Sequence, residues 1–223
     1  GNAQSGFRTY STDASGLSSS KSLTINVTNA APTTPVDGNA LSNSVGEGAA
    51  TGTLVGLTAG SSDPSGGTVL YSLSNSAGGR FAIDGSTGVV SVADGSLLNH
   101  DAATSHSITV VASDASGLTS NATFAIAITN VAPNTPNDAS TAANSVAEGA
   151  AAGTSIGLTV ASSDQSGGTV SYSLSNDAVG RFTIDGVTGI VSVADGTLLN
   201  QDAATSHSIT IVATDAGGLT ASS

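Results

Sequence analysis

Acidic residues with the chemistry of cation ligands recur along this chain at a fixed spacing of 101 residues. Of the sixteen acids fourteen are aspartates, and the only two glutamates, Glu47 and Glu148, occupy equivalent places. Other acids that recur in this phase, at turns or strand ends, include Asp63 and Asp164, Asp101 and Asp202, and Asp13, Asp114 and Asp215. Calcium binds six to eight oxygens at roughly 2.3–2.6 Å, drawn from carboxylates, amide carbonyls and main-chain carbonyls on separate loops. The spacing therefore predicts calcium sites formed by loop tips of adjoining domains.

The sequence around these acids is itself repeated, over a length that corresponds to a whole domain. Residues 44–120 align with 145–221 without a gap and differ at nineteen of seventy-seven positions, so each copy must fold around its own core. Residues 7–32 align in the same phase with 108–133. We therefore expect three parts, which are the C-terminal strands of a preceding repeat at 1–31, a repeat at 32–132, and a repeat lacking its last strand at 133–223.

The composition excludes several classes of function. The net charge is −12 and only four residues are basic, so a nucleic-acid partner and an anionic membrane surface are not expected. No apolar run reaches transmembrane length, so membrane insertion is not expected either. Because cysteine is absent, no disulfide can cross-link the domains. Any cross-bracing outside the hydrophobic core must come from hydrogen bonds or metal ions. The absence of methionine favours a mature or excised piece of a secreted protein.

The apolar residues of one copy alternate with a period of two, which indicates strands with one buried face. Examples are Val69, Tyr71 and Leu73, and then Val90 and Val92. Glycine-containing turn signals separate these segments, and with 52–58 and a short edge at 43–45 about seven strands are predicted. No segment has a helical period. The proline-bearing stretches at 31–35 and 132–136 are interpreted as stiffened linkers.

Three segments together resemble the cadherin and cadherin-like repeats, including those of large bacterial surface adhesins. FAIDGSTGVVSVADGSLLNHD at 81–101 resembles F-x-I-D-x-x-T-G-x-I...L-D-R-E, VVASDASG at 110–117 resembles A-x-D-x-G, and SVGEGAATGT at 44–53 resembles E-G-x-x-x-G-T. The resemblance covers essentially all of both copies. It implies an all-β fold of tandem seven-stranded antiparallel Greek-key β-sandwiches of the cadherin/immunoglobulin-like class, in an extracellular or cell-surface location.

The resemblance also implies which residues bind calcium where the two copies meet. The first copy would supply Glu47, Asn99 and Asp101, the second Asp164 and Asp215, with Asn130 before the linker. The full candidate metal set, counting equivalent positions, is Glu47, Asp63, Asn99, Asp101, Asp114, Asn130, Glu148, Asp164, Asp202 and Asp215. The chain departs from the family pattern where Asn99 and Asn200, Ser65 and Ser166, and a linker proline replace aspartates. Fewer or weaker calcium sites than is typical of the family are therefore expected.

The aspartates have a second interpretation, because an aspartate in a turn commonly accepts hydrogen bonds from the following main chain. This interpretation is preferred for four aspartates that precede glycine or a strand, namely Asp84, Asp94, Asp185 and Asp195. For Asp63, Asp114, Asp164 and Asp215, metal binding and turn capping remain equally open. Arg80 and Arg181 are interpreted as surface packing or local ion pairs.

Catalysis is not expected from this sequence. There is no G-x-S-x-G elbow, and His100, His106 and His207 have no partners at the spacing of a nucleophile or metal site. Neither an enzymatic activity nor a small-molecule substrate is predicted. A carbohydrate-binding platform would need surface aromatics, and aromatic residues make up only 3% of the chain.

The positions within the repeat at which the sequence begins and ends leave two hypotheses open. Ser223 aligns with Ala122, so the second copy would lack the counterpart of Phe124, Ile126 and Ile128. Leu23, Ile25 and Val27 near the start carry the same alternation in that phase. Either the sequence is a window on a longer array, or the strand at about 20–29 of a neighbouring molecule completes the second copy, building a filament head to tail.

The prediction for function is a structural repeat of an extracellular adhesin or surface fibre. It would act as a calcium-stiffened spacer in cell adhesion or biofilm formation, with neighbouring copies of the repeat, covalent or head-to-tail, as its partners. The alternative is a self-assembling filament subunit.

Overall fold

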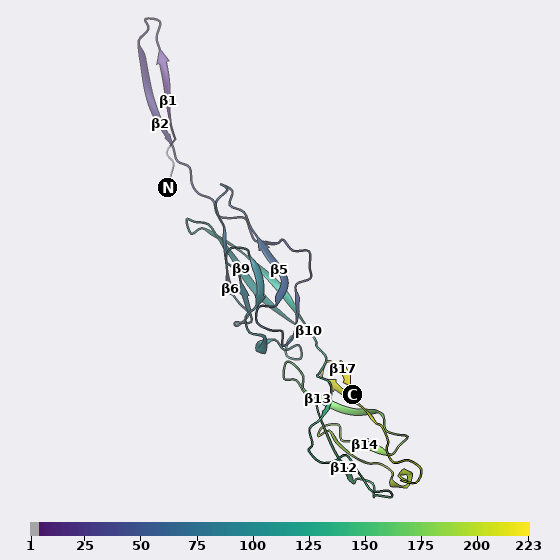
Figure 1. The fold of residues 1–223 in the computed structure, drawn as a ribbon. Helices are drawn as coiled ribbons and strands as arrows, with labels where there is room; N and C mark the ends of the chain where they lie inside the picture. Colours follow the sequence, from purple (N-terminus) through teal and green to yellow (C-terminus); the bar gives the residue numbers. More distant parts are fainter. Residues whose placement is uncertain (1–4) are drawn as a thin grey trace.

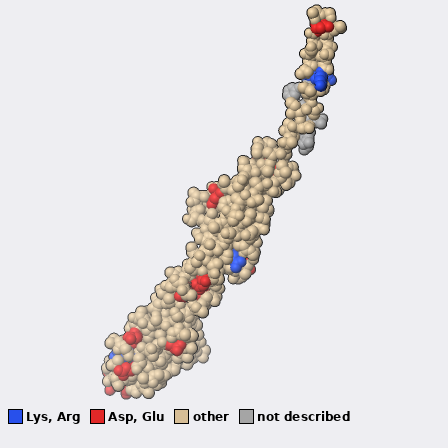
Figure 2. All heavy atoms as spheres, turned by 180° about the vertical axis from the view of Figure 1, so that it is seen from behind, with Lys and Arg blue, Asp and Glu red and all other residues tan. Residues whose placement is uncertain are grey.

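The computed structural model describes residues 5–223, which form three parts in a line (Figure 1). An N-terminal hairpin is followed by two further bodies, which we call repeat 1 and repeat 2 after the expected repeats at 32–132 and 133–223. The surface view from behind has the same long, narrow outline (Figure 2). Among residues 5–223 the only helical segments are two 3₁₀ turns, η1 (Gly95–Leu97) and η2 (Gly196–Leu198). No helix in the described part of the chain is long and apolar enough to span a bilayer.

The hairpin pairs β1 (Ser5–Thr12) with β2 (Ser18–Ile25) in an antiparallel register that runs from Ser5 opposite Ile25 to Thr12 opposite Ser18. Asp13 closes its turn by accepting the N–H groups of Ser15 and Leu17. Every residue of β2 is exposed, including its apolar ones. The hairpin is therefore stabilised mainly by its own main-chain ladder, and it packs against no core of its own.

Repeat 1 is a sandwich of two four-stranded sheets. One sheet has the order β3-β5-β8-β7 and the other the order β4-β10-β9-β6. The strands are β3 (Val36–Asp37), β4 (Ser44–Gly46), β5 (Leu54–Gly60), β6 (Leu70–Asn75), β7 (Phe81–Ile83), β8 (Val89–Val92), β9 (Ser105–Ser113) and β10 (Thr119–Thr129). The predicted antiparallel two-sheet sandwich is confirmed, with one addition and one exception. The addition is β3, and the exception is β4, which runs parallel to β10 because the chain changes sheets between β3 and β4.

The core of repeat 1 lies between its two sheets. The apolar residues that alternate along the strands are buried, and those with no more than 1% of their surface exposed include Leu57, Val90, Leu98, Ile108 and Ile126. A bulge where β5 meets β8 depends on Gly56, which has φ +81° and lies so close to Ser42 that a Cβ would be 2.3 Å from its carbonyl oxygen. Only glycine fits this position without strain.

Repeat 2 has the same plan in a less complete form. Its sheets have the orders β11-β12-β15-β14 and β13-β16-β17. The strands are β11 (Asn137–Asp138), β12 (Ser155–Ala161), β13 (Val170–Asn176), β14 (Phe182–Ile184), β15 (Ile190–Val193), β16 (Thr210–Asp215) and β17 (Thr220–Ser222). Residues 145–147, the counterpart of β4, and 206–209, the counterpart of the start of β9, are not in strands. The core cluster is correspondingly smaller.

The proline-bearing linkers are packed rather than free. Pro32, Pro35, Pro133 and Pro136 are all buried. The main chain of each linker is fixed in the same way, because Thr33 N donates to Ser62 O at 2.8 Å and Asn134 N donates to Ser163 O at 2.9 Å. Each linker is therefore fixed to the repeat that follows it.

The unequal cores predict that the two repeats unfold separately, with repeat 2 melting first. Ile108→Ala, in the filled core, should cost about 2–5 kcal/mol, whereas Ile209→Ala at the equivalent half-buried position should cost less. Calorimetry should resolve two transitions, the upper one shifted by Ile108→Ala and the lower one by Ile209→Ala. A single transition moved equally by both substitutions would contradict this expectation.

Candidate metal centre

Glu47 lies in the turn after β4 and is almost completely buried, with 1% of its surface exposed. Its Oε1 accepts the main-chain N–H of Val131 at 3.0 Å, and its Oε2 accepts that of His100 at 2.9 Å. Its own main-chain N–H donates to Thr129 O. The side chain therefore connects the turn after β4 with the η1 loop and with the linker into repeat 2.

Asp164 projects from the loop after β12 and is 6% exposed. Its Oδ1 accepts the N–H and the hydroxyl of Ser166 at 2.7 and 2.6 Å. Its Oδ2 is buried and has no hydrogen-bond partner. Burial raises the pKa of this carboxyl, but the hydrogen bonds from Ser166, Gly168 and Gly167 outweigh it and hold the pKa below the usual value. An ionised oxygen with no partner thus remains inside the protein.

Asp101 of repeat 1 meets Asp164 of repeat 2 beside Gly168. A Cβ built on Gly168 would lie 2.7 Å from Asp101 Oδ2 and 3.4 Å from Asp164 Oδ2, so both carboxylates approach one point. On the same side, a Cβ on Gly48 would lie 2.9 Å from Gln165 O, which places the Glu47 turn against the Asp164 loop. Carboxylates drawn together from two repeats repel each other unless a cation lies between them.

Asn130, at the end of β10, reaches into repeat 2. Its Nδ2 lies 3.3 Å from both carboxylate oxygens of Asp215, and its Oδ1 is buried without a partner. Asp215 is 5% exposed, and its Oδ1 also accepts the N–H of Leu219 at 2.8 Å. The junction therefore holds a second buried oxygen, from an amide, with no hydrogen bond.

The structure brings together five of the predicted residues, which we call the junction set: Glu47, Asp101, Asn130, Asp164 and Asp215. Asn99 does not contribute an oxygen in the same way, because its Oδ1 accepts the N–H of Ala102 in its own turn at 2.8 Å. The remaining predicted residues are Asp63, Asp114, Glu148 and Asp202. Asp63 accepts from Ser65 in its own turn, Asp114 accepts from Asn29, and Glu148 accepts from Gln201, so these three have their partners outside the junction set.

One residue at the hairpin side was not predicted. Asn29 Nδ2 donates to Asp114 Oδ2 at 2.7 Å, as Asn130 does to Asp215. The signal that could have identified it is the Thr-Asn pair at 28–29, which lies 101 residues before the Thr-Asn pair at 129–130. The asparagine–aspartate contact found between the two repeats is thus also present at the start of repeat 1.

Four aspartates serve as turn caps, as predicted. The Oδ1 atoms of Asp84, Asp94, Asp185 and Asp195 each accept a main-chain N–H two residues further along, at 2.9–3.0 Å. Asp94 and Asp195 are the N-caps of η1 and η2. The guanidinium groups of Arg80 and Arg181 donate to main-chain carbonyls of their own repeats, for example Arg80 Nε to Leu97 O at 2.9 Å.

The junction set contains oxygens of the kind that calcium binds, and they are not carboxylates alone. Within residues 5–223, no three Asp, Glu, His or Cys side chains are arranged to hold a metal ion by themselves. Calcium also accepts amide and main-chain carbonyl oxygens. The buried oxygens without partners, Asp164 Oδ2 and Asn130 Oδ1, are of the kind that such an ion would satisfy.

Comparison with known proteins identifies the architecture. Residues 42–129 match the model of the cadherin domain family. The fold of this chain is cadherin-like. Cadherin domains are extracellular, non-enzymatic modules typical of adhesion proteins, and they generally bind calcium. A comparison with curated protein sequences found no match.

Solved structures of cadherins resemble the chain over most of its length. Mouse cadherin-23 EC22-24 is 22% identical, with a TM-score of 0.41, and the match covers 97% of this chain and 70% of that one. Drosophila N-cadherin EC1-4 is 21% identical, with a TM-score of 0.47, covering 99% and 56%. Protocadherin Gamma B2 domains 1-5 are 20% identical, with a TM-score of 0.45, covering 96% and 42%. The chain thus spans about half the length of the latter two.

Glu47 and Glu148 offer a matched test of the junction. Glu47→Gln turns one carboxylate oxygen into an NH₂ group, which would face the N–H of His100 or Val131, so it should destabilise repeat 1 by about 1–3 kcal/mol. Glu148→Gln, at an exposed position, should have an effect within about 0.5 kcal/mol. Urea unfolding followed by circular dichroism measures both. Equal effects would show that the Glu47 contacts do not stabilise the junction.

The turn-capping aspartates predict a loss of stability in acid. The hydroxyl of Ser86 and the N–H groups of Thr87 and Ser86 lower the pKa of Asp84 below the usual 3.8, and the N–H groups of Thr188 and Val187 do the same for Asp185. A pKa that is lower in the folded chain stabilises the fold above the unfolded pKa, and this contribution is lost as the pH falls through the folded pKa.

In chelator, the melting temperature should therefore fall as the pH is lowered from about 4 towards 2. The double variant Asp84→Asn and Asp185→Asn should show a shallower fall, because its side chains no longer titrate. An unchanged pH profile in the double variant would contradict the assignment.

Proposed function

We propose that this chain is a spacer segment of a large bacterial surface adhesin or fibre, in which calcium at the junction set fixes one repeat in line with the next. The junction set would supply oxygens from both repeats, with Asp164 and Asp215 facing Glu47, Asp101 and Asn130 across the linker. Calcium would supply the positive charge that the surrounding protein lacks. The substitutions at Asn99, Ser166 and Pro133 favour one or two ions rather than a larger cluster.

The single observation that carries the proposal is the pair of buried oxygens without hydrogen bonds at the junction, Asp164 Oδ2 and Asn130 Oδ1. Buried polar atoms in proteins are nearly always paired, and a buried carboxylate requires a partner above all. The chain has only four basic residues, and those of the two repeats, Arg80 and Arg181, are engaged with main-chain carbonyls. The exposed face seen in Figure 2 is likewise poor in basic side chains.

A spacer function fits the near-identity of the repeats. A module that only adds length needs the same fold and the same junction each time, without distinct binding surfaces. Asp101 and the Glu47 turn of repeat 1 lie against the Asp164 loop of repeat 2, and the linker prolines are already buried. The cation would thus act on the remaining freedom of the junction, which is the bend and twist between repeats.

The proposal predicts that calcium stabilises the chain. An ion that binds only the folded form adds about 2.7 kcal/mol at one hundred times its dissociation constant. Melting in millimolar calcium and in chelator should therefore differ, and small-angle scattering should show a longer, straighter particle with calcium.

Asp164→Asn should reduce or abolish this calcium shift. Asp63→Asn serves as the control, because Asp63 is the counterpart of Asp164 in repeat 1 but lies outside the junction between the repeats. If millimolar calcium changes neither the melting temperature nor the small-angle scattering of the wild-type protein, the proposal is refuted. The acids would then be turn caps only.

A further inference from the structure

Few hydrogen bonds within residues 5–223 cross from one part of the chain to the next, and those that do come from an asparagine side chain. Repeat 1 is joined to repeat 2 by Asn130 Nδ2, which lies 3.3 Å from both carboxylate oxygens of Asp215. The part before repeat 1 is joined to it by Asn29 Nδ2, which donates to Asp114 Oδ2 at 2.7 Å and to Ser116 Oγ at 2.6 Å. Because the two asparagines are 101 residues apart, the same link occurs at both junctions.

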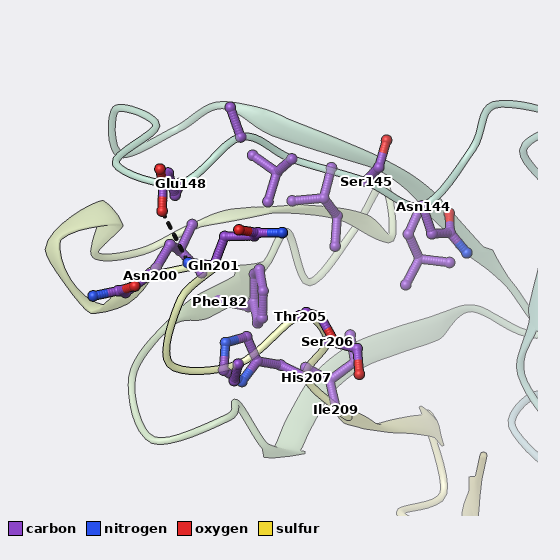
Figure 3. Close-up of a pocket in the computed structure, with 16 residues that line it drawn as sticks. Asn144, Ser145, Glu148, Phe182, Asn200, Gln201, Thr205, Ser206, His207 and Ile209 are labelled. Atoms are coloured by element: carbon purple, nitrogen blue, oxygen red, sulfur yellow. Dashed lines mark hydrogen bonds between the residues drawn. The ribbon is translucent and has the colours of Figure 1, made fainter.

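The glutamate contacts, in contrast, stay within one repeat. Glu47 accepts the N–H groups of His100 and Val131, which both belong to repeat 1. Figure 3 shows the counterpart in repeat 2, where the dashed line marks the hydrogen bond from the main-chain N–H of Gln201 to Glu148 Oε2. The glutamates therefore fix the loops of their own repeat, whereas the asparagines link one repeat to the next.

Both partners of the Asn130 link are held in place by their own repeats. Asn130 directly follows β10, which pairs with β4 on one side and with β9 on the other. Asp215 is the last residue of β16 and is 5% exposed, and its Oδ1 accepts the N–H of Leu219 at 2.8 Å. A hydrogen bond between groups that are already ordered costs little conformational entropy. The link between Asn130 and Asp215 can therefore contribute most of its energy to joining the repeats.

The turn that follows Asp215 has room for the asparagine because it contains Gly217. A Cβ built on Gly217 would overlap the amide nitrogen of Asn130 and would lie 2.7 Å from Asn130 Cγ. The counterpart of Gly217 in repeat 1 is Ser116, whose hydroxyl accepts a hydrogen bond from Asn29. The two turns thus hold the same amide in different ways, by close contact in repeat 2 and by an added hydrogen bond in repeat 1.

An amide suits this position because it donates a hydrogen bond to a carboxylate without adding charge. A second carboxylate there would repel the first unless a cation lay between them. Burial raises the pKa of Asp114, but hydrogen bonds from Ser116, Leu118 and Asn29 outweigh it and hold the pKa below the usual value. The Asn29 amide therefore favours the ionised carboxylate by a donation that needs no metal ion.

We propose that Asn29 and Asn130 are clasps that join successive repeats independently of any cation, and that they limit how far a junction depends on calcium. In the proposed function, calcium would restrain the junction where Asp101 and Asp164 approach each other beside Gly168. Without calcium, the repeats would stay joined at the clasp and bend about it. The statement about calcium rests on the proposed function, whereas the clasp itself does not.

Distances between spin labels, measured by pulsed electron paramagnetic resonance, test the clasp in the full chain. Because the chain has no cysteine, Ser74→Cys with Ser175→Cys places one label at an equivalent exposed position of each repeat. In chelator, Asn130→Ala should widen the distribution of distances relative to the labelled parent, because the donor is lost. Gly217→Ala should widen it as well, although it removes neither polar group, because the added Cβ displaces the amide.

Asn130→Asp separates the clasp from calcium. It replaces the donor with a carboxylate beside Asp215, so in chelator the distances should spread at least as widely as in Asn130→Ala. Millimolar calcium should narrow the distribution again, because a cation can join two carboxylates. The control Asn121→Asp adds the same charge at an exposed position near the opposite end of β10 and should leave the parent distribution unchanged.

Two results would overturn the inference. One is a distribution in chelator that is no wider in Asn130→Ala and Asn130→Asp than in the parent, and the other is an equal widening by Asn121→Asp. A distribution that spreads in Asn130→Asp and stays wide in calcium would support the clasp and contradict the proposed calcium function. Circular dichroism of each variant should match that of the parent, so that a change in distance reports the junction and not unfolding.

Discussion

The structure depends on how buried acidic oxygens are held at the junction between its two repeats. Glu47 is bonded to the linker at Val131 and to His100, and Asn130 reaches across to Asp215. Because the chain has no disulfides and few basic residues, hydrogen bonds and a cation are the means left to balance this charge. The polar contacts across this junction are thus made by a small group of oxygens and by the main chain of the linker.

Local pattern was sufficient for the strands, but not for every pairing. The period-two alternation predicted the two-sheet sandwich, because each buried face has to be apolar. It could not predict β3, which is two residues long, or the parallel pairing of β4, which follows from a change of sheet. For the candidate site, the 101-residue spacing was enough to select Glu47, Asp164 and Asp215. It could not predict that Asn99 Oδ1 accepts the N–H of Ala102, because this hydrogen bond depends on the geometry of the turn.

Glu47 and Glu148 show why equal sequence does not give equal sites. Both follow the same turn and both accept a main-chain N–H from the loop after the 3₁₀ turn, from His100 and Gln201 respectively. Glu47 also accepts a hydrogen bond from Val131 in the linker, and it is 1% exposed whereas Glu148 is exposed. The candidate site is therefore a property of the contact between two repeats.

The last strand of a repeat connects the core with the junction. In repeat 1 the strand that buries Ile126 and Ile128 ends at Asn130, whose amide faces Asp215, so filling the core also delivers an oxygen to the acids. Ser22–Asn29 has the same arrangement, with apolar residues followed by Asn29 against Asp114. A cation that favours the junction would therefore favour the paired last strand of the repeat by the same free energy, because linkage is reciprocal. The stiffness of the junction and the stability of the core would then be two consequences of one segment.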